Sequence, residues 1–599
     1  MASRLNPRLL TAASVLLCLT GVDGRALDQL DFNVAGSDTA LETSLKSASG
    51  LIAAKKAKQV TALDLFADAR AEYGKLISAL YAQGHYGPVI HVLIDGREAA
   101  DIAPLDAPTT INHIVVTVDP GPAFRFSKAS ITPLANNTDL PTGFAIGQLA
   151  ESGLIQEAVQ SSVTAWREKG FAKTSVATQE LVANHNASTL SAAITLNTGP
   201  KLRFGPLTVH GAQRMREDRV RAIAGLPVGE TFSPTELARA TERLRRTGVF
   251  SSATMSEDDG IIAPDLQGIT ADLVESRLHR YTFGAEVASQ DGVKLTGSWL
   301  HRNLLGGGER LEITGEIAGI AGQSGGTDYS LGTTLDRPAT ITADTTLNLG
   351  ATISQINDTD TTAKLANVSV GFTQYFRDTL TGHVAISYAA IQGTDAAGSY
   401  DYRSLDLPIG VIWDRRDNKT DPTKLFYIDT TVTPFYGFGD TDNGAQFKFD
   451  ARVYKGLGVD SKVVFAARLQ GGAVFGADIL RTPRNDLFYS GGGGTVRGQP
   501  YQSLGVDVDD GGTTIHIGGN QFLAGSLEAR VKVTEKFGVV GFVDMGMVGA
   551  DGYGSNVQTG AGLGVRYDTG VGPVRLDLAM PVNGGGNGLQ VYVGLGQAF

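Results

Sequence analysis

The chain has 599 residues and a formal net charge of −11, and charged residues make up only 19% of it. An acidic chain of this kind is not expected to bind nucleic acid or an anionic surface through its overall charge. It contains 75 glycines and one cysteine, which excludes disulfides within the chain.

The first 26 residues, 1–26, are typical of a secretory signal peptide. Arg4 and Arg8 form a basic start, and an apolar run over residues 9–21 follows. A transmembrane helix is the alternative, but the run is shorter than the roughly 20 residues that a span requires. Cys18 lies inside this leader, so the processed chain is expected to have no thiol. No later segment has 18 consecutive apolar residues, so a membrane would have to be crossed by strands.

An internal repeat organises the first half of the chain. The strings GPAFRF and GPKLRFG begin 78 residues apart, at Gly121 and Gly199, and Gly170 and Gly248 have the same spacing. Each of the latter two glycines ends an apolar stripe with helical spacing, and the second stripe begins at the capping sequence Ser233–Glu236. We interpret the repeat as three small β-α-α-β modules with open sheet edges that can receive an extended peptide. The predicted modules are residues 38–119, 120–199 and 200–277.

From residue 278 the hydrophobic period changes to two. In residues 345–355, Leu347, Leu349 and Ile353 alternate with small or polar residues. A soluble sandwich and a transmembrane barrel both produce this pattern. The barrel is favoured because the polar face carries Thr, Ser, Asn, Gly and Gln more than Lys and Glu, and because the chain ends in an alternating strand with an aromatic residue. Residues 278–599 have room for about 16 antiparallel strands at roughly 20 residues each.

Six motifs in the second half of the chain carry a resemblance to a known family. They are HRNLLGGGERL (301–311), DRRDNKTDPTKLF (414–426), TVRG (495–498), GSLEARVKV (525–533), FVDMGMV (542–548) and GLGVRYDTGVGPVRLDLAMPV (562–582). They resemble motifs of the BamA/TamA superfamily of outer-membrane assembly proteins, in which the soluble modules are called POTRA domains. Three modules followed by a barrel are similar to the TamA branch in particular. The resemblance implies three periplasmic POTRA domains and a barrel in the bacterial outer membrane.

An arginine stands inside a glycine-rich stretch, SGGGGTVRGQPYQSLG, and predicts a loop that is latched to the barrel interior. Strand alternation turns Glu528 and Asp544 inward, and the resemblance implies that the loop arginine, Arg497, pairs with such a wall carboxylate. The predicted latch therefore consists of Val496, Arg497, Gly498, Glu528 and Asp544. The latch either takes part in substrate handling or only stabilises the barrel. One departure from the family pattern concerns Gln499-Pro500, which separate Gly498 from the aromatic Tyr501.

The resemblance implies that the protein helps to insert or assemble other barrel proteins, such as autotransporters, or helps lipid transport together with an inner-membrane partner. The expected partners are a TamB-like inner-membrane protein, unfolded outer-membrane proteins and outer-membrane lipids. The first strand, from about Tyr281 to Val287, and the last, from about Gln590 to Phe599, are expected to close the barrel poorly, and Gln597 and Phe599 to form its carboxyl-terminal signal. Alternatives are a passive secretion pore and the general BamA insertase.

Catalytic chemistry is not expected. Residues 322–326 satisfy G-x-S-x-G, but no helix is predicted to follow them. The nine histidines have no metal-binding spacing, so neither a metal nor a cofactor is predicted.

Overall fold

The computed structural model describes residues 29–36, 39–57, 61–289, 291–322, 325–357, 361–551, 554–570, 572–583 and 588–599. The predicted signal peptide, 1–26, lies outside these residues. The chain forms two compact units: one contains the first two small sheets, and the other contains the third sheet and the barrel. Within the described part of the chain, no helix is both long and apolar enough to cross a membrane.

The first module packs three helices on a four-stranded sheet of order β1-β4-β2-β3. Its core is apolar and includes Leu51, Leu76 and Val116, each fully buried. The predicted start at residue 38 is wrong, because β1 precedes it and pairs in parallel with β4. The elements are β1 (Gln29–Val34), α1 (Thr39–Ala48), α2 (Gly50–Ala57), α3 (Ala62–Ala82), β2 (Val89–Ile94), β3 (Arg97–Glu98) and β4 (His113–Asp119).

The second module has a three-stranded sheet of order β5-β7-β6 and one helix. The expectation of two helices is wrong here, because Pro141, Gly143 and Gly147 occupy the stretch before α4, which is irregular. The elements are β5 (Arg125–Thr132), α4 (Ser152–Arg167), β6 (Ser175–Asn184) and β7 (Thr189–Asn197).

The third module has the expected two helices, with a sheet of order β8-β10-β9. The glycines at matching positions of the three modules, Gly84, Gly170 and Gly248, have positive φ angles of 80°, 97° and 68°. This shared left-handed conformation explains why glycine recurs there. The elements are β8 (Arg203–His210), α5 (Glu217–Ala224), α6 (Pro234–Arg246), β9 (Phe250–Ile262) and β10 (Leu266–Glu275).

Helix α6 binds the turn between the barrel strands β14 and β15. Arg243 Nη2 lies 2.6 Å from Asp344 Oδ2, and Arg246 Nη2 lies 3.2 Å from Asp344 Oδ1. The guanidinium of Arg246 also stacks on the ring of Tyr375, 3.7 Å from its centroid. Burial raises the pKa of Asp344, but the two arginines lower it by more, so this carboxyl has a pKa below its usual value.

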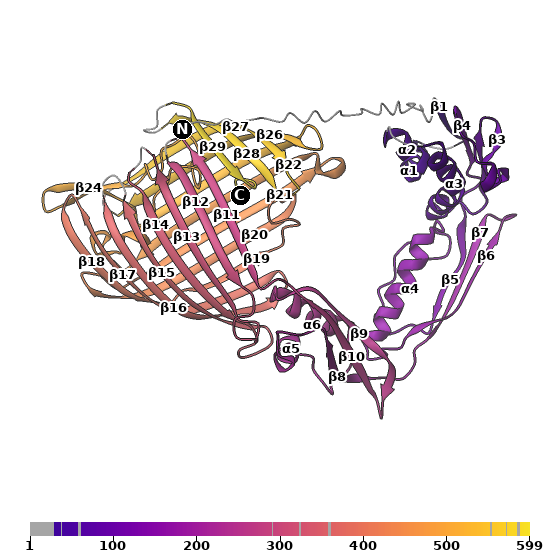
Figure 1. Ribbon diagram of the computed structural model, residues 1–599, viewed down its shortest axis with the longest axis horizontal. Coiled ribbons are helices and arrows are strands. Elements are labelled where there is room, and N and C mark those ends of the chain that lie inside the picture. The colour runs from indigo at the N-terminus through magenta and orange to yellow at the C-terminus, as the bar shows by residue number, and fades with distance from the viewer. Residues whose placement is uncertain are drawn as a thin grey trace, which may run out of the picture. The chain divides into compact units, whose positions relative to one another are not determined.

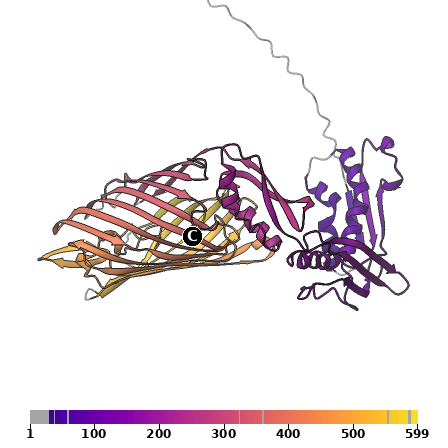
Figure 2. The same ribbon diagram turned by 90° about the horizontal axis from the view of Figure 1, so that it is seen from below.

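The second half of the chain closes into an antiparallel barrel (Figures 1 and 2). Among the described residues, β18 and β19 pair with the same two neighbours and are the halves of one strand broken at Leu407-Pro408. The barrel therefore has 16 strands, as predicted. They are β11 (His279–Ala288), β12 (Gly292–His301), β13 (Arg310–Ile320), β14 (Asp328–Arg337), β15 (Thr345–Asn357), β16 (Thr362–Arg377), β17 (Leu380–Asp395), β18 (Gly398–Asp406) with β19 (Ile409–Asp414), β20 (Lys424–Gly439), β21 (Gly444–Leu457), β22 (Val463–Phe475), β25 (Gln521–Lys532), β26 (Phe537–Ala550), β27 (Gly554–Asp568), β28 (Pro573–Asn583) and β29 (Gln590–Leu595).

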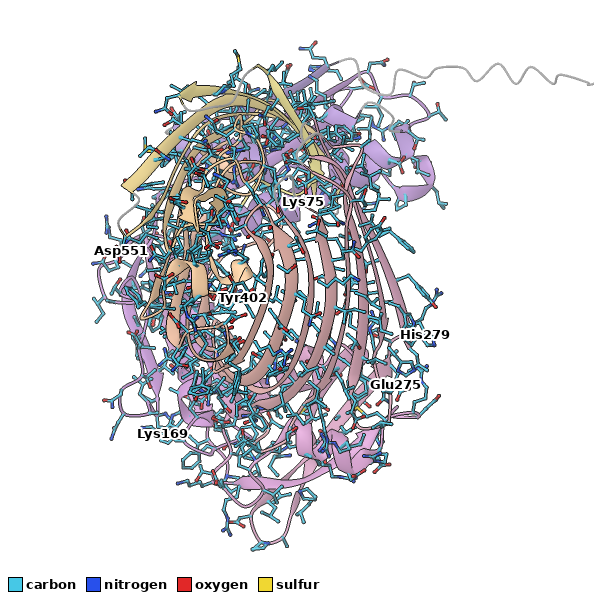
Figure 3. All side chains as sticks on the ribbon, turned by 90° about the vertical axis from the view of Figure 1, so that its left-hand side faces the viewer. Lys75, Lys169, Glu275, His279, Tyr402 and Asp551 are labelled. Atoms are coloured by element: carbon cyan, nitrogen blue, oxygen red, sulfur yellow. The ribbon has the colours of Figure 1, made fainter. Side chains whose placement is uncertain are left out.

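The alternating pattern separates an apolar outer face from a polar lumen. Figure 3 shows the barrel from one end, with its side chains drawn. On β15, Leu349 and Ile353 point outward and are 39% and 59% exposed. Asn348 points inward, where its side chain donates to Asp336 Oδ1 and accepts from Thr373 Oγ1, both at 2.7 Å. Apolar side chains directed to the outside and hydrogen-bonded polar ones inside are the arrangement of a barrel in hydrocarbon.

A charge on the outer face is expected to destabilise the barrel in lipid. Leu349→Lys places an ammonium near the middle of β15 and is expected to cost ~2–4 kcal/mol, because hydrocarbon does not solvate it. Thr352→Lys, on the luminal face of the same strand, is the matched control and should cost far less. Urea titration of the liposome-inserted protein measures both. Equal losses at the two positions would contradict the assignment of the faces.

Candidate functional site

A long connection between β22 and β25 enters the barrel. Its first part contains two short 3-10 turns, Ile479–Arg481 and Arg484–Asp486, and its last part is the hairpin β23 (Val506–Asp510) with β24 (Thr513–Ile517). Between them run the four glycines and the segment Thr495–Gly498. Thr495 Oγ1 accepts a hydrogen bond from Gly491 N at 2.8 Å, so the glycine run closes into a turn and is not an open linker.

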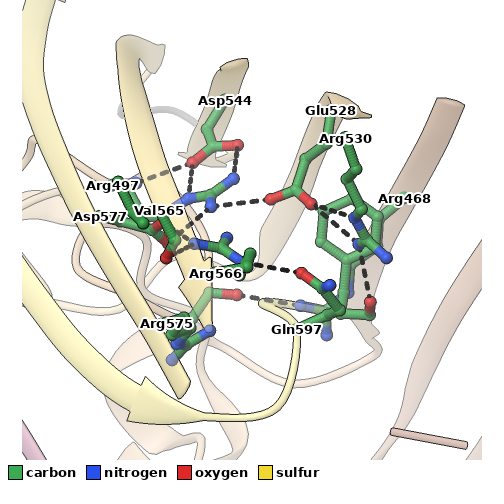
Figure 4. Close-up of polar contacts among 12 residues, drawn as sticks. Arg468, Arg497, Glu528, Arg530, Asp544, Val565, Arg566, Arg575, Asp577 and Gln597 are labelled. Carbon is green, nitrogen blue, oxygen red and sulfur yellow. Dashed lines mark hydrogen bonds and ion pairs between the residues drawn. The ribbon is translucent and has the colours of Figure 1, made fainter. Parts of the chain in front are cut away.

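The guanidinium of Arg497 lies against the inner wall and is 3% exposed. Its Nε and Nη2 donate to the two carboxylate oxygens of Asp544 on β26, at 2.7 and 3.0 Å. Nη1 lies 2.8 Å from Glu528 Oε1 on β25 and 3.2 Å from Asp577 Oδ2 on β28. The face of the guanidinium covers the ring of Phe542, 3.5 Å from its centroid. The structure therefore brings together the three charged residues that the sequence placed in one latch (Figure 4).

The site is a balanced network of charges rather than a single ion pair. Arg566 Nη1 lies 2.5 Å from Asp577 Oδ1, and Arg530 Nη2 lies 2.8 Å from Glu528 Oε2. With Arg497 these give three cations for three carboxylates, all nearly inaccessible to water (Figure 4). Sequence reasoning missed Asp577, although its place between the outward Leu576 and Leu578 carried the same signal as Asp544. A buried charge needs such partners, because its desolvation is costly otherwise.

Glycines on both sides let the loop approach the wall. A Cβ on Gly560 of β27 would lie 1.8 Å from the carbonyl oxygen of Arg497, and one on Gly546 of β26 would lie 2.7 Å from a methyl group of Val496. Val496 itself is completely buried. Gly498 has a φ of 92°, and a Cβ there would lie 2.7 Å from the backbone of Met580. The glycine after the arginine is thus required by conformation and by space.

The two residues that interrupt the family pattern are accommodated without an aromatic side chain at the loop tip. Gln499 is completely buried, and its amide nitrogen donates to the carbonyl oxygens of Thr559 and Asn583 on β27 and β28. Tyr501 is 43% exposed. Aromatic contact comes from the wall instead: Phe542 lies under Arg497, and the hydroxyl of Tyr592 accepts from Gly498 N at 3.1 Å.

The barrel closes at a short seam between its first and last strands. Among the described residues, β11 and β29 share two registered pairs, Val287–Val593 and Ala288–Tyr592. In the part of the chain that the structure describes, the remaining residues of β11, from His279 to Glu286, have no partner strand on that side. An ion pair spans the seam, because Arg575 Nη2 on β28 lies 2.8 Å from Glu286 Oε1 on β11.

The last strand ends earlier than predicted. It stops at Leu595 and not at Phe599, because Gly596 adopts a φ of 89° and turns the chain. Phe599 is 7% exposed and packs on Tyr454 and Ala466, while its carbonyl oxygen accepts from Arg530 at 3.1 Å. The side chain of Gln597 accepts from Arg566 Nε and donates to Asp421 Oδ1. Both residues of the predicted carboxyl-terminal signal therefore contact the luminal network.

No group of three His, Cys, Asp or Glu side chains in the described ranges is arranged to hold a metal ion. Ser324, the serine of the G-x-S-x-G match, lies outside the described residues.

Comparisons with known proteins agree with the fold. Residues 303–599 match the Omp85 superfamily domain, and residues 202–275 match POTRA, described as a surface antigen variable number repeat. BamA from Haemophilus ducreyi lacking POTRA domains 1-3 is 17% identical with a TM-score of 0.60, over 79% of this chain and 100% of that one. CdiB from Acinetobacter baumannii is 11% identical with a TM-score of 0.52, over 80% and 90%. CdiB from Escherichia coli is 13% identical with a TM-score of 0.50, over 79% and 91%.

Removing the loop guanidinium is expected to destabilise the barrel strongly. Arg497→Ala leaves three buried carboxylates with two arginines, and breaking a buried pair in this way costs about 3–5 kcal/mol. Arg497→Lys should recover part of the loss, since it restores charge without bidentate geometry. Arg481→Ala, which breaks the exposed pair with Asp442, is the control and should cost less than about 1 kcal/mol. Urea unfolding of the purified barrel provides the measurement, and an unchanged midpoint for Arg497→Ala would refute the latch.

A single methyl group on the wall is expected to displace the loop. Gly560→Ala forces the carbonyl of Arg497 away from β27, so the loop should become accessible to protease while the barrel still forms. Gly541→Ala on β26 points outward, where the new Cβ would meet Leu563 at 3.7 Å, and should change nothing. Limited proteolysis around residues 491–498 distinguishes them, and equal protection of both variants would show that the close approach is not needed.

Proposed function

We propose that this chain, which belongs to the Omp85 superfamily, is an outer-membrane assembly factor of the translocation and assembly module type. In this proposal the barrel lies in the outer membrane and the three modules in the periplasm, and the protein helps to insert other barrel proteins, such as autotransporters. The observation that carries the proposal is the seam, where two registered pairs close a barrel whose other neighbouring strands share longer ladders.

The physical argument concerns unpaired backbone groups. In hydrocarbon an unpaired N–H or C=O costs several kcal/mol, so a strand edge exposed at the seam attracts any strand that can pair with it. Residues 279–286 of β11 present such an edge. An incoming strand can add there by β-augmentation and form its own barrel progressively. The free energy comes from the folding of the substrate, so no nucleotide, metal or covalent step is needed.

Tyr592 connects the latch with the seam. This residue pairs with Ala288 in the seam, and its hydroxyl binds Gly498 N in the loop. Movement of β29 at the seam would therefore shift a loop contact, and release of the loop would remove a contact of the last strand. We propose that the latch keeps the barrel rigid while the seam is engaged by substrate.

Three modules support the TamA type over the general BamA insertase, because the family resemblance associates larger module numbers with BamA. The partners we propose are a TamB-like inner-membrane protein, unfolded outer-membrane proteins and membrane lipids. The exposed edge strand β6, in which Leu181 and Val182 are 45% and 62% exposed, offers an extended polypeptide a place to pair.

A passive secretion pore is the competing function, and electrical conductance separates the two. The insertase proposal requires the Arg497 loop to remain in the lumen during activity, so wild type should conduct little in planar bilayers. Deleting the loop should raise the conductance without raising insertion. A large open conductance of the intact protein, together with no insertion activity, would favour the pore.

A reversible lock across the seam tests the insertase proposal directly. Val287→Cys with Val593→Cys joins registered, outward residues of β11 and β29, and Val539→Cys with Val565→Cys joins an equivalent pair on β26 and β27. In liposomes the oxidised seam lock should reduce insertion of an autotransporter barrel to the spontaneous rate, and reductant should restore it. The control lock should have no effect. Full activity of the seam-locked protein would overturn the proposal.

A further inference from the structure

The outer face of the barrel is hollowed beside the first strand. A cavity of about 920 Å³ spans β11 to β17 and is lined mainly by outward-facing residues. The loop and latch contribute no residue to it. At about 4.8 Å between neighbouring strands, six spacings give a length of roughly 29 Å. It is therefore a long, open trough on the surface that faces hydrocarbon in the proposed membrane location.

Strand register explains the depth of the trough. One registered row across the strands consists of Gly297, Gly315, Leu331, Ile353 and Ala366, and it continues to Ala390. Four of these six residues are glycine or alanine, so the side chains at both ends of the row are small and leave space above the sheet. A Cβ added at Gly315 would meet no atom within 4 Å, so open space lies above this position. Phe283 of β11, 83% exposed, borders the end nearest the seam.

The neighbouring row gives the trough a polarity. It begins with the apolar Leu295 and Ile317 on β12 and β13, and it ends with Gln355, Lys364 and Gln392 on β15, β16 and β17. All of these residues line the cavity. One end of the trough is thus apolar, and the other end presents an ammonium between two amides. An amphiphile has the same division between its chains and its head group.

The charge at the polar end selects the head group. Lys364 is exposed and points outward at the start of β16, beside Gln355 and Gln392 in the register. This end of β16 lies at the opposite side of the barrel from the turn that binds α6, because β15 runs from that turn toward the β15–β16 connection. A lysine at the edge of a hydrocarbon region attracts anionic lipid with about 1 kcal/mol.

We propose that this trough is a binding site for an anionic membrane lipid, whose acyl chains lie along the row from Gly297 to Ala390 and whose head group binds Lys364. The lipid belongs to the leaflet opposite the turn that binds α6. Its chains reach Phe283, so the lipid lies beside the unpaired edge of β11. This inference rests on the proposed membrane location, but it does not require the seam to open.

Native mass spectrometry of the full-length protein tests the site, with phosphatidylglycerol and phosphatidylcholine of identical acyl chains as probes. Wild type is expected to retain phosphatidylglycerol in preference. Gly315→Leu fills the trough and should reduce retention of both lipids at least tenfold. Gly525→Leu is the matched control, because Gly525 faces outward on β25 and has no atom closer than 3.8 Å to a new Cβ. It should retain lipid as wild type does.

Charge is tested separately from shape. Lys364→Ala should lower the affinity for phosphatidylglycerol about fivefold, the factor that corresponds to about 1 kcal/mol, and leave that for phosphatidylcholine unchanged. Lys424→Ala, an exposed lysine at the start of β20, is the control and should alter neither. Unchanged heat-dependent gel migration of each variant shows that it has folded.

The inference is overturned if Gly315→Leu retains lipid as well as wild type does. It is also overturned if Lys364→Ala keeps the preference for phosphatidylglycerol over phosphatidylcholine. A polypeptide segment bound in the trough of the purified protein instead of lipid would overturn it as well. These outcomes do not depend on the insertase proposal, which the disulfide lock across the seam tests separately. A wild-type protein that shows no preference for phosphatidylglycerol but inserts substrate in a seam-dependent way would reject the lipid site alone.

Discussion

A buried guanidinium organises the lumen of this barrel. The side chain of Arg497 is almost completely buried. Burying such a charge costs free energy unless carboxylates surround it. Three strands supply them, through Glu528, Asp544 and Asp577. Because three neighbouring carboxylates repel one another, Arg530 and Arg566 are needed to complete the charge balance. The loop position, the inward residues of four strands and the wall glycines all follow from this one requirement.

The network extends to the place where the barrel is weakest. Arg530 binds the carbonyl of Phe599, and Arg566 binds Gln597, so the residues after β29 are drawn into the lumen. A chain that turns inward at Gly596 cannot continue the ladder with β11. The turn limits how far the seam can extend, and the same charges that hold the loop also hold the residues after this turn. Tyr592 connects the two features, since it belongs to the seam and binds the loop.

The inner and outer faces of the barrel wall depend on different interactions. The inner face is specified by charges and hydrogen bonds with defined direction, and a single exchange there leaves a partner unsatisfied. The outer face is specified mostly by side-chain size. A row that begins and ends with glycine and alanine residues lines the trough on this face. The polar end of the outer trough, with Lys364, is an exception to the apolar surface and marks where a head group is expected.

The sequence by itself determined the features that depend on periodicity. The alternation after residue 278 predicted 16 strands and the inward direction of Glu528 and Asp544, because side chains of a strand point to opposite faces in turn. The 78-residue spacing predicted the repeated modules, since the turn after each helix demands a left-handed glycine. These properties are local, and local backbone geometry is readable from a single chain.

Tertiary structure decided the features that depend on which distant segments meet. The addition of β1 to the first sheet, the burial of Gln499 against β27 and β28, and the stacking of Phe542 on Arg497 join residues that no local period relates. The inward turn of residues 596–599 is of the same kind, because an alternating sequence favours a continued strand until a luminal cation offers a better partner. Apart from the pairing of β1 in the first module, these contacts lie inside the barrel and form only when the long loop and the chain end meet its inner wall.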